Sequence, residues 1–422
     1  MSPTGRPGNR QDAGRWTPPT TGRIAKRGPI AIFRAVASKG AFPRRRPRPL
    51  RPLPDRRRRN KSGGAGLVSS VWHDTAPSPL EVTPLSDMPP AIICIPVRDE
   101  EAALPALLAA LGKLDGNARP DLCFYLDGCT DRSESVLRAA GRDRLHIVAG
   151  PRAAEPNAGR ARRAALAIAM ALPQAADALL FTTDADSLPA PDWIAAGAAA
   201  LRVADVVAGL IVREDGAADR GQSRIERYYD RLHACRRRLD PVPWEAATTH
   251  HFSGGANIAI RAACYRALGG FRPLPSAEDA TLLDDAARAG FRVRRDAALV
   301  VATSSRRDGR ALEGLAGSLR ALDGGEVQYV AHPHDLAWQA AAQAHARRAF
   351  ATIDDTACRA GLGTGLGLGA DHILGVARDC PNAEAFAMRV VPAPPTRRDP
   401  VPLAVAEAIL ADLEAQWRMV AA

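Results

Sequence analysis

The sequence predicts an α/β fold with a mainly parallel, mixed sheet that is flanked by helices. Between residues 91 and 183, short apolar runs of strand length alternate with longer segments whose apolar residues recur at helical spacing. Polar and acidic residues gather directly after several of the apolar runs. Strands separated by helices form right-handed crossovers, so their carboxyl ends meet at one edge of a sheet, where such folds bind ligands.

The first predicted strand is Ala91–Pro96, an apolar run that includes three isoleucines. A helix follows over Glu100–Leu114, in which leucines recur at helical spacing. The same patterns predict strands at Leu122–Leu126, Leu145–Val148, Ala178–Thr183, Val206–Val212, Phe291–Arg294 and Ala298–Ala302, and helices at Ser133–Ala140, Gly159–Ala171, Ser223–Arg238 and Glu278–Ala289.

The region 311–422 is predicted to be a helical accessory segment. Helical patterns cover residues 335–353 and Leu403–Val420. The glycine-rich run Gly361–Gly369 between them is predicted to be a mobile loop, because no strand precedes its partial match to a dinucleotide-binding motif. The segment is expected either to cover an acceptor site or to mediate self-association.

The net charge of +11 arises from the first part of the chain. Residues 1–62 carry 18 Lys and Arg residues against two aspartates, and such an Arg/Pro-rich segment cannot bury a core. We expect residues 1–87 to be a disordered basic tail and 88–310 to be the main domain. The tail is either an arm for nucleic acid or anionic lipid, a solvated extension, or, as we favour, upstream of a true start at Met88.

Cysteine usage and hydropathy predict a cytoplasmic protein that can also lie at the inner face of the membrane. The seven cysteines are scattered and include no C-x-x-C pair, which favours reduced thiols over a zinc site or a disulfide framework. No uncharged apolar stretch reaches the length of a membrane span.

The most informative motif is Asp184-Ala185-Asp186, which directly follows the predicted strand Ala178–Thr183. Two carboxylates at the carboxyl end of a buried strand lie where open α/β sheets bind ligands. Carboxylate oxygens are also the ligands that Mg²⁺ or Mn²⁺ takes when it shares its coordination shell with substrate phosphates. The motif therefore predicts a site for a divalent metal ion and a phosphate-bearing ligand.

Further polar motifs follow in a fixed order, and together they carry a resemblance to a known family. They are Ile95–Glu101, Leu126–Asp131, Gly159–Arg163, Asp184–Asp186, Pro191–Trp193, Ser253–Asn257, Gly269–Phe271, Glu278-Asp279 and Thr303–Arg307. In this order the series resembles the family 2 glycosyltransferases, enzymes of the GT-A fold, over residues 90–310. The resemblance implies a non-processive enzyme that moves a sugar from a nucleotide-diphosphate sugar to an acceptor hydroxyl with inversion.

The resemblance also implies roles for the matching residues. Pro96, Arg98 and Glu100 correspond to the loop around the base and ribose, and Asp127 to a base contact. This chain has Leu126-Asp127 where relatives often carry two aspartates. Arg162 lies near the nucleotide, Asp184 contacts the ribose or a metal-bound water, and Asp186 binds the metal. Apart from the resemblance, Gly254, Gly255 and Asn257 are expected to form the wall where acceptor or sugar approaches closely, because glycine lets the backbone come near a ligand. Arg306 and Arg307 contact the diphosphate or are surface charges.

Glu278-Asp279 carries the second half of the implied chemistry. In the family the aspartate is the general base that deprotonates the acceptor, so Asp279 is expected to face the cleft with Glu278 supporting it or binding acceptor. The alternative is that these carboxylates only stabilise the amino terminus of the helix that follows. Trp193 and Phe252 are either sugar-stacking or packing residues.

Two other functions compete with the transferase. A nucleotidyltransferase would need a glycine-rich basic loop after its first strand, and Pro96–Glu101 contains no glycine. A catalytically silent binding or scaffold protein of the same fold would have no physical need for Asp186 and Asp279. The expected partners are a nucleotide-diphosphate sugar and a hydroxyl acceptor of the metabolite, lipid-headgroup or glycan class, and nucleic acid is not expected.

Overall fold

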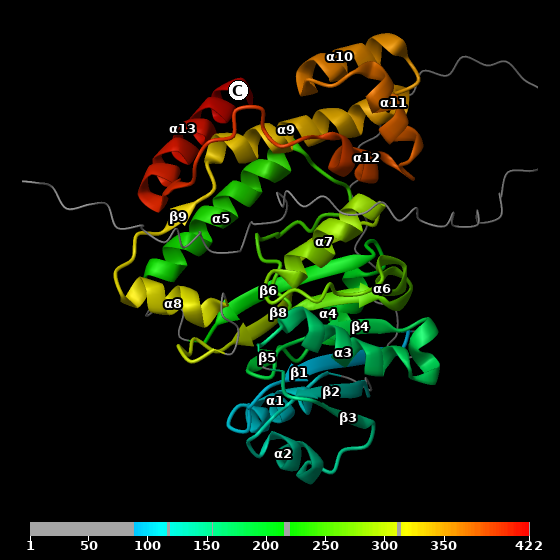
Figure 1. Ribbon diagram of the computed structural model, residues 1–422, viewed down its shortest axis with the longest axis vertical. Helices are drawn as coiled ribbons and strands as arrows, with labels where there is room; N and C mark the ends of the chain where they lie inside the picture. Colours follow the sequence, from blue (N-terminus) through cyan, green and yellow to red (C-terminus); the bar gives the residue numbers. More distant parts are fainter. Residues whose placement is uncertain (1–87, 116–118, 154, 215–219, 310–313, 422) are drawn as a thin grey trace, which may run out of the picture.

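The computed structural model describes residues 88–421, apart from 116–118, 154, 215–219 and 310–313. The predicted basic tail, 1–87, lies outside the described residues. The main body is a mixed sheet with helices on both faces, and a layer of helices lies over one end of it (Figure 1). Within the described residues, no helix is both long and apolar enough to cross a membrane.

The sheet has eight strands in the order β3-β2-β1-β4-β7-β6-β8-β5. Their bounds are β1 Ala91–Val97, β2 Asp121–Asp127, β3 Leu145–Gly150, β4 Leu179–Thr182, β5 Ser187–Pro189, β6 Val206–Arg213, β7 Ile258–Arg261 and β8 Val293–Thr303. Neighbours pair in parallel, except that β7 is antiparallel to β4 and β6, and β5 is antiparallel to β8. This confirms the predicted mainly parallel mixed sheet of the GT-A type.

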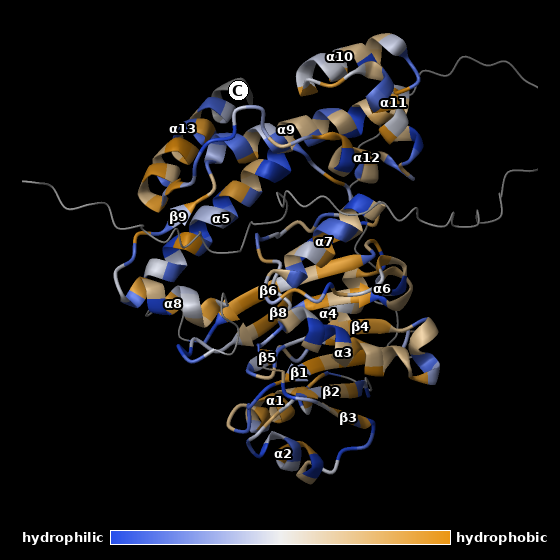
Figure 2. Cartoon of the chain, viewed as in Figure 1, coloured by the Kyte–Doolittle hydropathy of each residue, from blue (hydrophilic) through white to orange (hydrophobic). Residues whose placement is uncertain are grey.

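Alternation along β1 divides the core into two layers. Ile93 and Ile95 point to the face that is covered by α1 (Leu104–Leu111), α2 (Ser133–Ala139) and α4 (Trp193–Ala200). Ile92 and Cys94 point to the other face, which is covered by α3 (Ala158–Met170), α6 (Ala262–Leu268) and α7 (Glu278–Ala289). Figure 2 shows the corresponding hydrophobic colour along the strands. Successive side chains of a strand point to opposite faces, so both faces of this central strand must be apolar.

The helical layer combines α5 (Arg220–Leu239) with helices of the carboxyl-terminal region. These are α8 Leu315–Asp323, α9 Pro333–Ala349, α10 Thr356–Leu366, α11 Ala370–Arg378, α12 Ala383–Val390 and α13 Leu403–Ala421, with a small β9–β10 pair at Tyr329–Val330 and Val401–Pro402. One apolar cluster joins Tyr228 and Leu232 of α5 to Leu403 and Leu410 of α13. The layer also contacts the sheet domain, because Asn382 donates a hydrogen bond to the carbonyl of Gly290 (2.8 Å) at the end of α7.

Three of the predicted elements are wrong, two strands and one loop. Phe291–Arg294 and Ala298–Ala302 are parts of one strand, β8, whose register against β6 shifts between Gly209 and Leu210, so that the polar residues between them form an irregularity within the strand. Residues 361–366 of the predicted mobile loop belong to α10. Asp355 caps that helix by accepting hydrogen bonds from the amides of Ala357 and Cys358, and Gly367 ends it with a positive φ.

Candidate active site

The carboxyl ends of β1, β2 and β4 open into a cavity of about 260 Å³. Eight of the predicted site residues line it: Pro96, Arg98, Glu100, Asp127, Arg162, Asp184, Asp186 and Arg306. The other three, Gly255, Glu278 and Asp279, are connected to this lining through Arg162 and its neighbours. All the residues predicted from strand ends therefore gather at one edge of the sheet, as parallel strands require.

Asp186 lies where β4 turns toward β5. The backbone carbonyl of Asp186 accepts a hydrogen bond from the amide of Ser304 (3.2 Å), which ties this turn to the end of β8. Burial, with a further contribution from Asp184, raises the pKa of Asp186 to about 6. Two close carboxylates repel each other when both are ionised, so a cation between or beside them stabilises the ionised pair.

Arg306 is the cation that meets these carboxylates. Its guanidinium binds both oxygens of Glu100 and lies 3.1 Å from Oδ2 of Asp186. The hydrogen bond to Glu100 raises the pKa of Arg306, so it is a permanent positive charge in the cavity. Arg307 instead pairs with Asp323 on α8 (2.9 Å), outside the cavity lining.

Arg162 connects the two acidic motifs. It is 6% exposed, and its guanidinium lies 3.0 Å from Asp184 and 3.2 Å from Glu278, and donates to the carbonyl of Gly255 (2.9 Å). Burial alone would lower the pKa of Arg162, but Asp184, Glu278 and Asp279 together raise it. A guanidinium can satisfy several oxygens in one plane, which is why an arginine suits this position.

Asp279 is held by backbone amides. Its Oδ2 accepts from the amide of Gly255 (2.8 Å) and its Oδ1 from the amide of Ala280 (2.7 Å). Burial raises the pKa of Asp279, and that of the neighbouring Glu278 is raised for the same reason. A carboxylate whose pKa is raised toward the working pH is better suited to accept a proton than one with an ordinary value.

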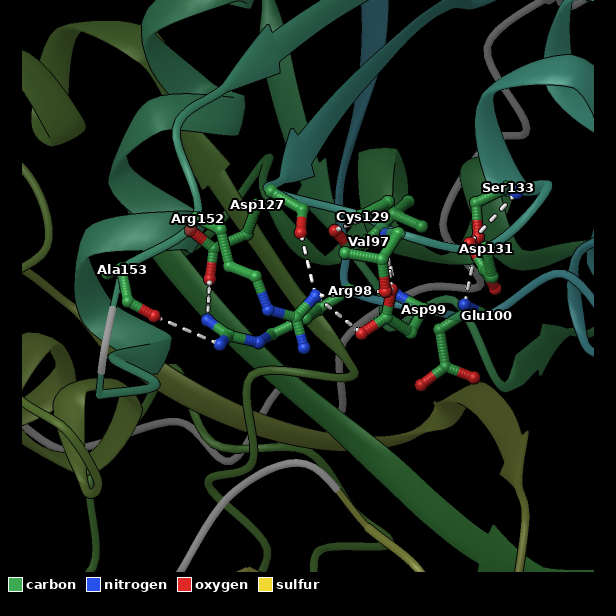
Figure 3. Close-up of polar contacts among 12 residues, drawn as sticks. Val97, Arg98, Asp99, Glu100, Asp127, Cys129, Asp131, Ser133, Arg152 and Ala153 are labelled. Atoms are coloured by element: carbon green, nitrogen blue, oxygen red, sulfur yellow. Dashed lines mark hydrogen bonds and ion pairs between the residues drawn. The ribbon is translucent and has the colours of Figure 1, made fainter.

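The part of the cavity formed by the loops after β1 and β2 is organised by Arg98 and Asp127 (Figure 3). Arg98 donates to Oδ2 of Asp127 (3.0 Å) and to the carbonyl of Ala153 (3.2 Å). The other oxygen of Asp127, Oδ1, is buried and has no hydrogen-bond partner among the described residues, with Arg160 lying 4.0 Å away. A buried acceptor without a partner is costly, so Asp127 is poised to receive a donor group from a ligand.

The motifs did not predict how the loops after β1 and β2 are held together. Asp99, at a positive φ of 54°, accepts from the amide of Thr130 (2.7 Å) and pairs with Arg152 (2.8 Å). Asp99, Cys129 and Asp131 lie close enough to hold a cation. Asp131 instead accepts from the amides of Glu101 (2.9 Å) and Ser133 (3.0 Å), so these side chains fasten the two loops to each other. Arg152 gave no signal in the sequence, because it lies outside every motif.

Two residues considered for ligand contact belong to the core. Trp193 is fully buried, packs on Phe181 with ring centroids 5.0 Å apart, and donates to the side-chain oxygen of Asn257 (2.8 Å). Asn257 also donates to the carbonyls of Leu210 and Leu299 (both 2.8 Å). Packing, and not sugar stacking, is therefore the role of Trp193.

The comparisons with known proteins identify a glycosyltransferase domain in this chain. Residues 92–264 match the family described as "Glycosyl transferase family 2", and the chain carries a domain of that family. No protein of curated function matches the chain.

Solved structures with similar backbones include two that hold nucleotide sugars. S. aureus TarS 1-349 in complex with UDP-GlcNAc is 15% identical, with a TM-score of 0.41, over 72% of this chain and 90% of that chain. The mannosyltransferase PcManGT from Pyrobaculum calidifontis in complex with GDP-Man and Mn²⁺ is 18% identical, also with a TM-score of 0.41, over 74% of this chain and 90% of that chain.

Proposed function

We propose that the protein transfers a glycosyl group from a nucleotide-diphosphate sugar to an acceptor hydroxyl with inversion, using a divalent metal ion. The observation that carries this proposal is the connection of two acidic motifs, almost a hundred residues apart in sequence, through Arg162. One motif, Asp184–Asp186, faces the cavity that would hold the donor. The other ends in Asp279, whose raised pKa suits a base.

The carboxylates of Asp184 and Asp186 fit Mg²⁺ or Mn²⁺. Both face the same cavity, and Asp186 already neutralises a cation there, the guanidinium of Arg306. Two carboxylates are enough for Mg²⁺, which usually takes its remaining ligands from substrate phosphates and water. When bound, the metal would stabilise the negative charge that develops on the departing diphosphate.

The side chains of this protein supply the remaining steps. Asp279 accepts the proton of the acceptor hydroxyl while the acceptor oxygen bonds to the anomeric carbon. The bond from that carbon to the β-phosphate oxygen breaks, and the nucleoside diphosphate leaves with the electron pair. Arg306 offers a second positive charge to the leaving group. Asp127 would accept a hydrogen bond from the base through its buried, unpartnered oxygen.

Thermal denaturation with UDP, GDP, dTDP and CDP, each with and without Mn²⁺, tests the donor site. One nucleotide should stabilise the protein only in the presence of metal, by about 2.7 kcal/mol at a hundredfold excess over its Kd. Asp186→Asn should abolish the metal-dependent part. Asp192→Asn should keep it, because Asp192 is exposed in the turn after β5 and does not line the cavity. Absence of stabilisation by all four nucleotides would contradict the donor site and favour a silent scaffold.

A further inference from the structure

A second cavity, of about 230 Å³, lies between α5, α7, β8 and the carboxyl-terminal helices α9 and α12. It shares no lining residue with the donor cavity. Ala280, whose amide donates to Asp279, is part of its wall, and so is Ser253, two residues before Gly255. Asp279 itself lines neither cavity, but its neighbour Ala280 lines this one, and Arg162, which pairs with Glu278, lines the donor cavity, so the proposed general base is adjacent to both.

Four arginines line the second cavity. Arg347 pairs with two carboxylates, and we call the other three, Arg236, Arg237 and Arg295, the arginine cluster. The Nε atom of each is buried and has no hydrogen-bond partner among the described residues. Arg236 and Arg237 come from α5 and Arg295 from β8, so the fold brings them together from distant parts of the chain. Buried donors without partners carry a desolvation cost that a ligand with oxygen acceptors would remove.

The arginine cluster has little negative charge around it. Among the described residues, the carboxylate closest to it is Glu245, which lies 3.5 Å from Arg237 and accepts a hydrogen bond from the backbone amide of Arg295 (2.7 Å). Of the other carboxylates near this wall, Asp240 and Glu384 pair with Arg347, and Asp284 pairs with Arg288. Three guanidiniums thus share one carboxylate.

This excess of positive charge lowers the pKa of titratable groups nearby. Burial, together with Arg236 and Arg237, lowers the pKa of Arg295 to about 10. Burial and Arg295 lower the pKa of His250 to about 4, so this histidine is neutral at physiological pH. Like charges held together in a partly buried space favour the binding of an anion.

We infer that this cavity binds the acceptor and that the acceptor carries a phosphate group, which the arginine cluster holds while its hydroxyl reaches Asp279. This inference rests on the proposed transferase function. Inverting transfer brings the acceptor to the anomeric carbon from the side opposite the diphosphate, which matches a second cavity beyond Asp279. Guanidinium groups bind phosphate through paired, charge-assisted hydrogen bonds. Apolar residues of the same wall, including Leu283 and Met388, can contact the rest of the acceptor.

Phosphorus NMR titration of the full chain with inorganic phosphate, in buffer free of divalent metal, tests the inference. Wild-type protein should bind phosphate, and Arg236→Gln or Arg237→Gln should weaken binding at least about tenfold, because each removes a charge-assisted contact. Arg238→Gln is the matched control, since Arg238 is exposed on the same helix and does not line the cavity. Arg236→Lys, which keeps the charge, should recover part of the binding.

The variant Arg306→Gln distinguishes phosphate binding at the arginine cluster from binding in the donor cavity. If phosphate binds at the arginine cluster, this variant should leave the titration unchanged. Any one of three results would overturn the inference. Binding could be lost in Arg306→Gln alone, it could be absent in the wild-type protein at tens of millimolar phosphate, or it could be lost equally in Arg238→Gln. Metal-dependent stabilisation by a nucleotide should be the same in Arg236→Gln and wild-type protein. If phosphate binds to the arginine cluster while no nucleotide binds, the anion site stands and the transferase proposal fails.

Discussion

At the scale of single residues, the environment of Asp279 gives the most direct test of the chemistry. Asp279→Asn removes the proton acceptor and keeps a side-chain oxygen for only one of the two amides, those of Gly255 and Ala280, which bond to separate carboxylate oxygens of Asp279. We expect transfer to fall by about 10²–10⁴-fold, the usual contribution of general-base catalysis. The measurement is release of nucleoside diphosphate from the donor identified by thermal denaturation, at saturating metal.

Asp285→Asn is the control for this variant, because Asp285 lies on the same helix and pairs with Arg272 (2.7 Å) away from both cavities. Nucleotide-dependent stabilisation should be unchanged in both variants. Full turnover by Asp279→Asn would assign the base to another residue.

His250 predicts how stability depends on pH. Its pKa is lowered to about 4 by burial and by Arg295, whereas an unfolded histidine has a pKa of about 6.5. Between pH 6.5 and pH 4 the unfolded chain therefore binds a proton at this position and the folded chain does not. The free energy of unfolding should fall as the pH falls through this range, by up to about 1.4 kcal/mol per pH unit from this residue.

Urea denaturation at pH 7.5, 6 and 5 measures this dependence. His250→Gln should reduce the loss of stability between pH 6.5 and pH 5, whatever its effect at pH 7.5. His345→Gln should keep the wild-type dependence, because His345 is exposed on α9. The buried His233, whose pKa is also lowered by burial, should preserve part of the effect in both variants. A slope identical in His250→Gln and wild-type protein would refute the assignment.

At the scale of elements, the segment before β7 depends on Gly255. A Cβ at this position would lie 2.4 Å from Cζ and 2.5 Å from Nε of Arg162. The guanidinium would have to move away from Asp184 and Glu278, leaving buried carboxylates without their partner. We expect Gly255→Ala to cost about 3–5 kcal/mol of unfolding free energy and to abolish metal-dependent nucleotide binding.

Gly361→Ala is the matched control for Gly255→Ala. A Cβ on Gly361 would have no neighbour within 4 Å, and the residue lies in α10, where alanine is the better helix former. Urea denaturation should show equal or slightly greater stability, by about 0.4–1 kcal/mol. Equal effects of the two substitutions would show that the contact with Arg162 is unimportant.

Elements and their ends could be predicted where one local pattern dominated. The bounds of α7 were predicted without error, and β1 within one residue, because alternation and helical spacing are properties of neighbouring residues. The carboxylates that follow strands could be predicted to lie close together, because the carboxyl ends of parallel strands meet at one edge of a sheet. The sequence did not predict the pairing of Arg306 with Glu100 or the arginine cluster. Each joins residues that are far apart in sequence and meet only through tertiary packing. The glycine content of α10 predicts a loop, since glycine is a poor helix former, but Asp355 caps the helix.

At the scale of the whole molecule, α5 and α7 connect the sheet domain to the helical layer. Leu282 and Leu283 of α7 pack on the sheet, while the next helical turns contact α12, whose Met388 carbonyl accepts from Arg288 (2.8 Å). Arg224 and Arg231 of α5 pair with Glu407 and Glu414 of α13. The wall of the second cavity is built from both parts, so its geometry depends on how the helical layer is held.

This dependence leads to a prediction for Leu410, a fully buried residue of α13 in the apolar cluster with α5. Leu410→Ala should lower the unfolding free energy by about 2–5 kcal/mol through lost burial and a residual cavity. Val405→Ala on the same helix, where the side chain is 46% exposed, should change it by less than about 0.5 kcal/mol. Because α7 and α5 belong to both parts, tryptophan fluorescence and circular dichroism should report one shared urea transition, shifted in Leu410→Ala. A separate early transition that precedes the loss of nucleotide binding would instead show that the helical layer unfolds independently. Phosphate binding should then disappear at that first transition.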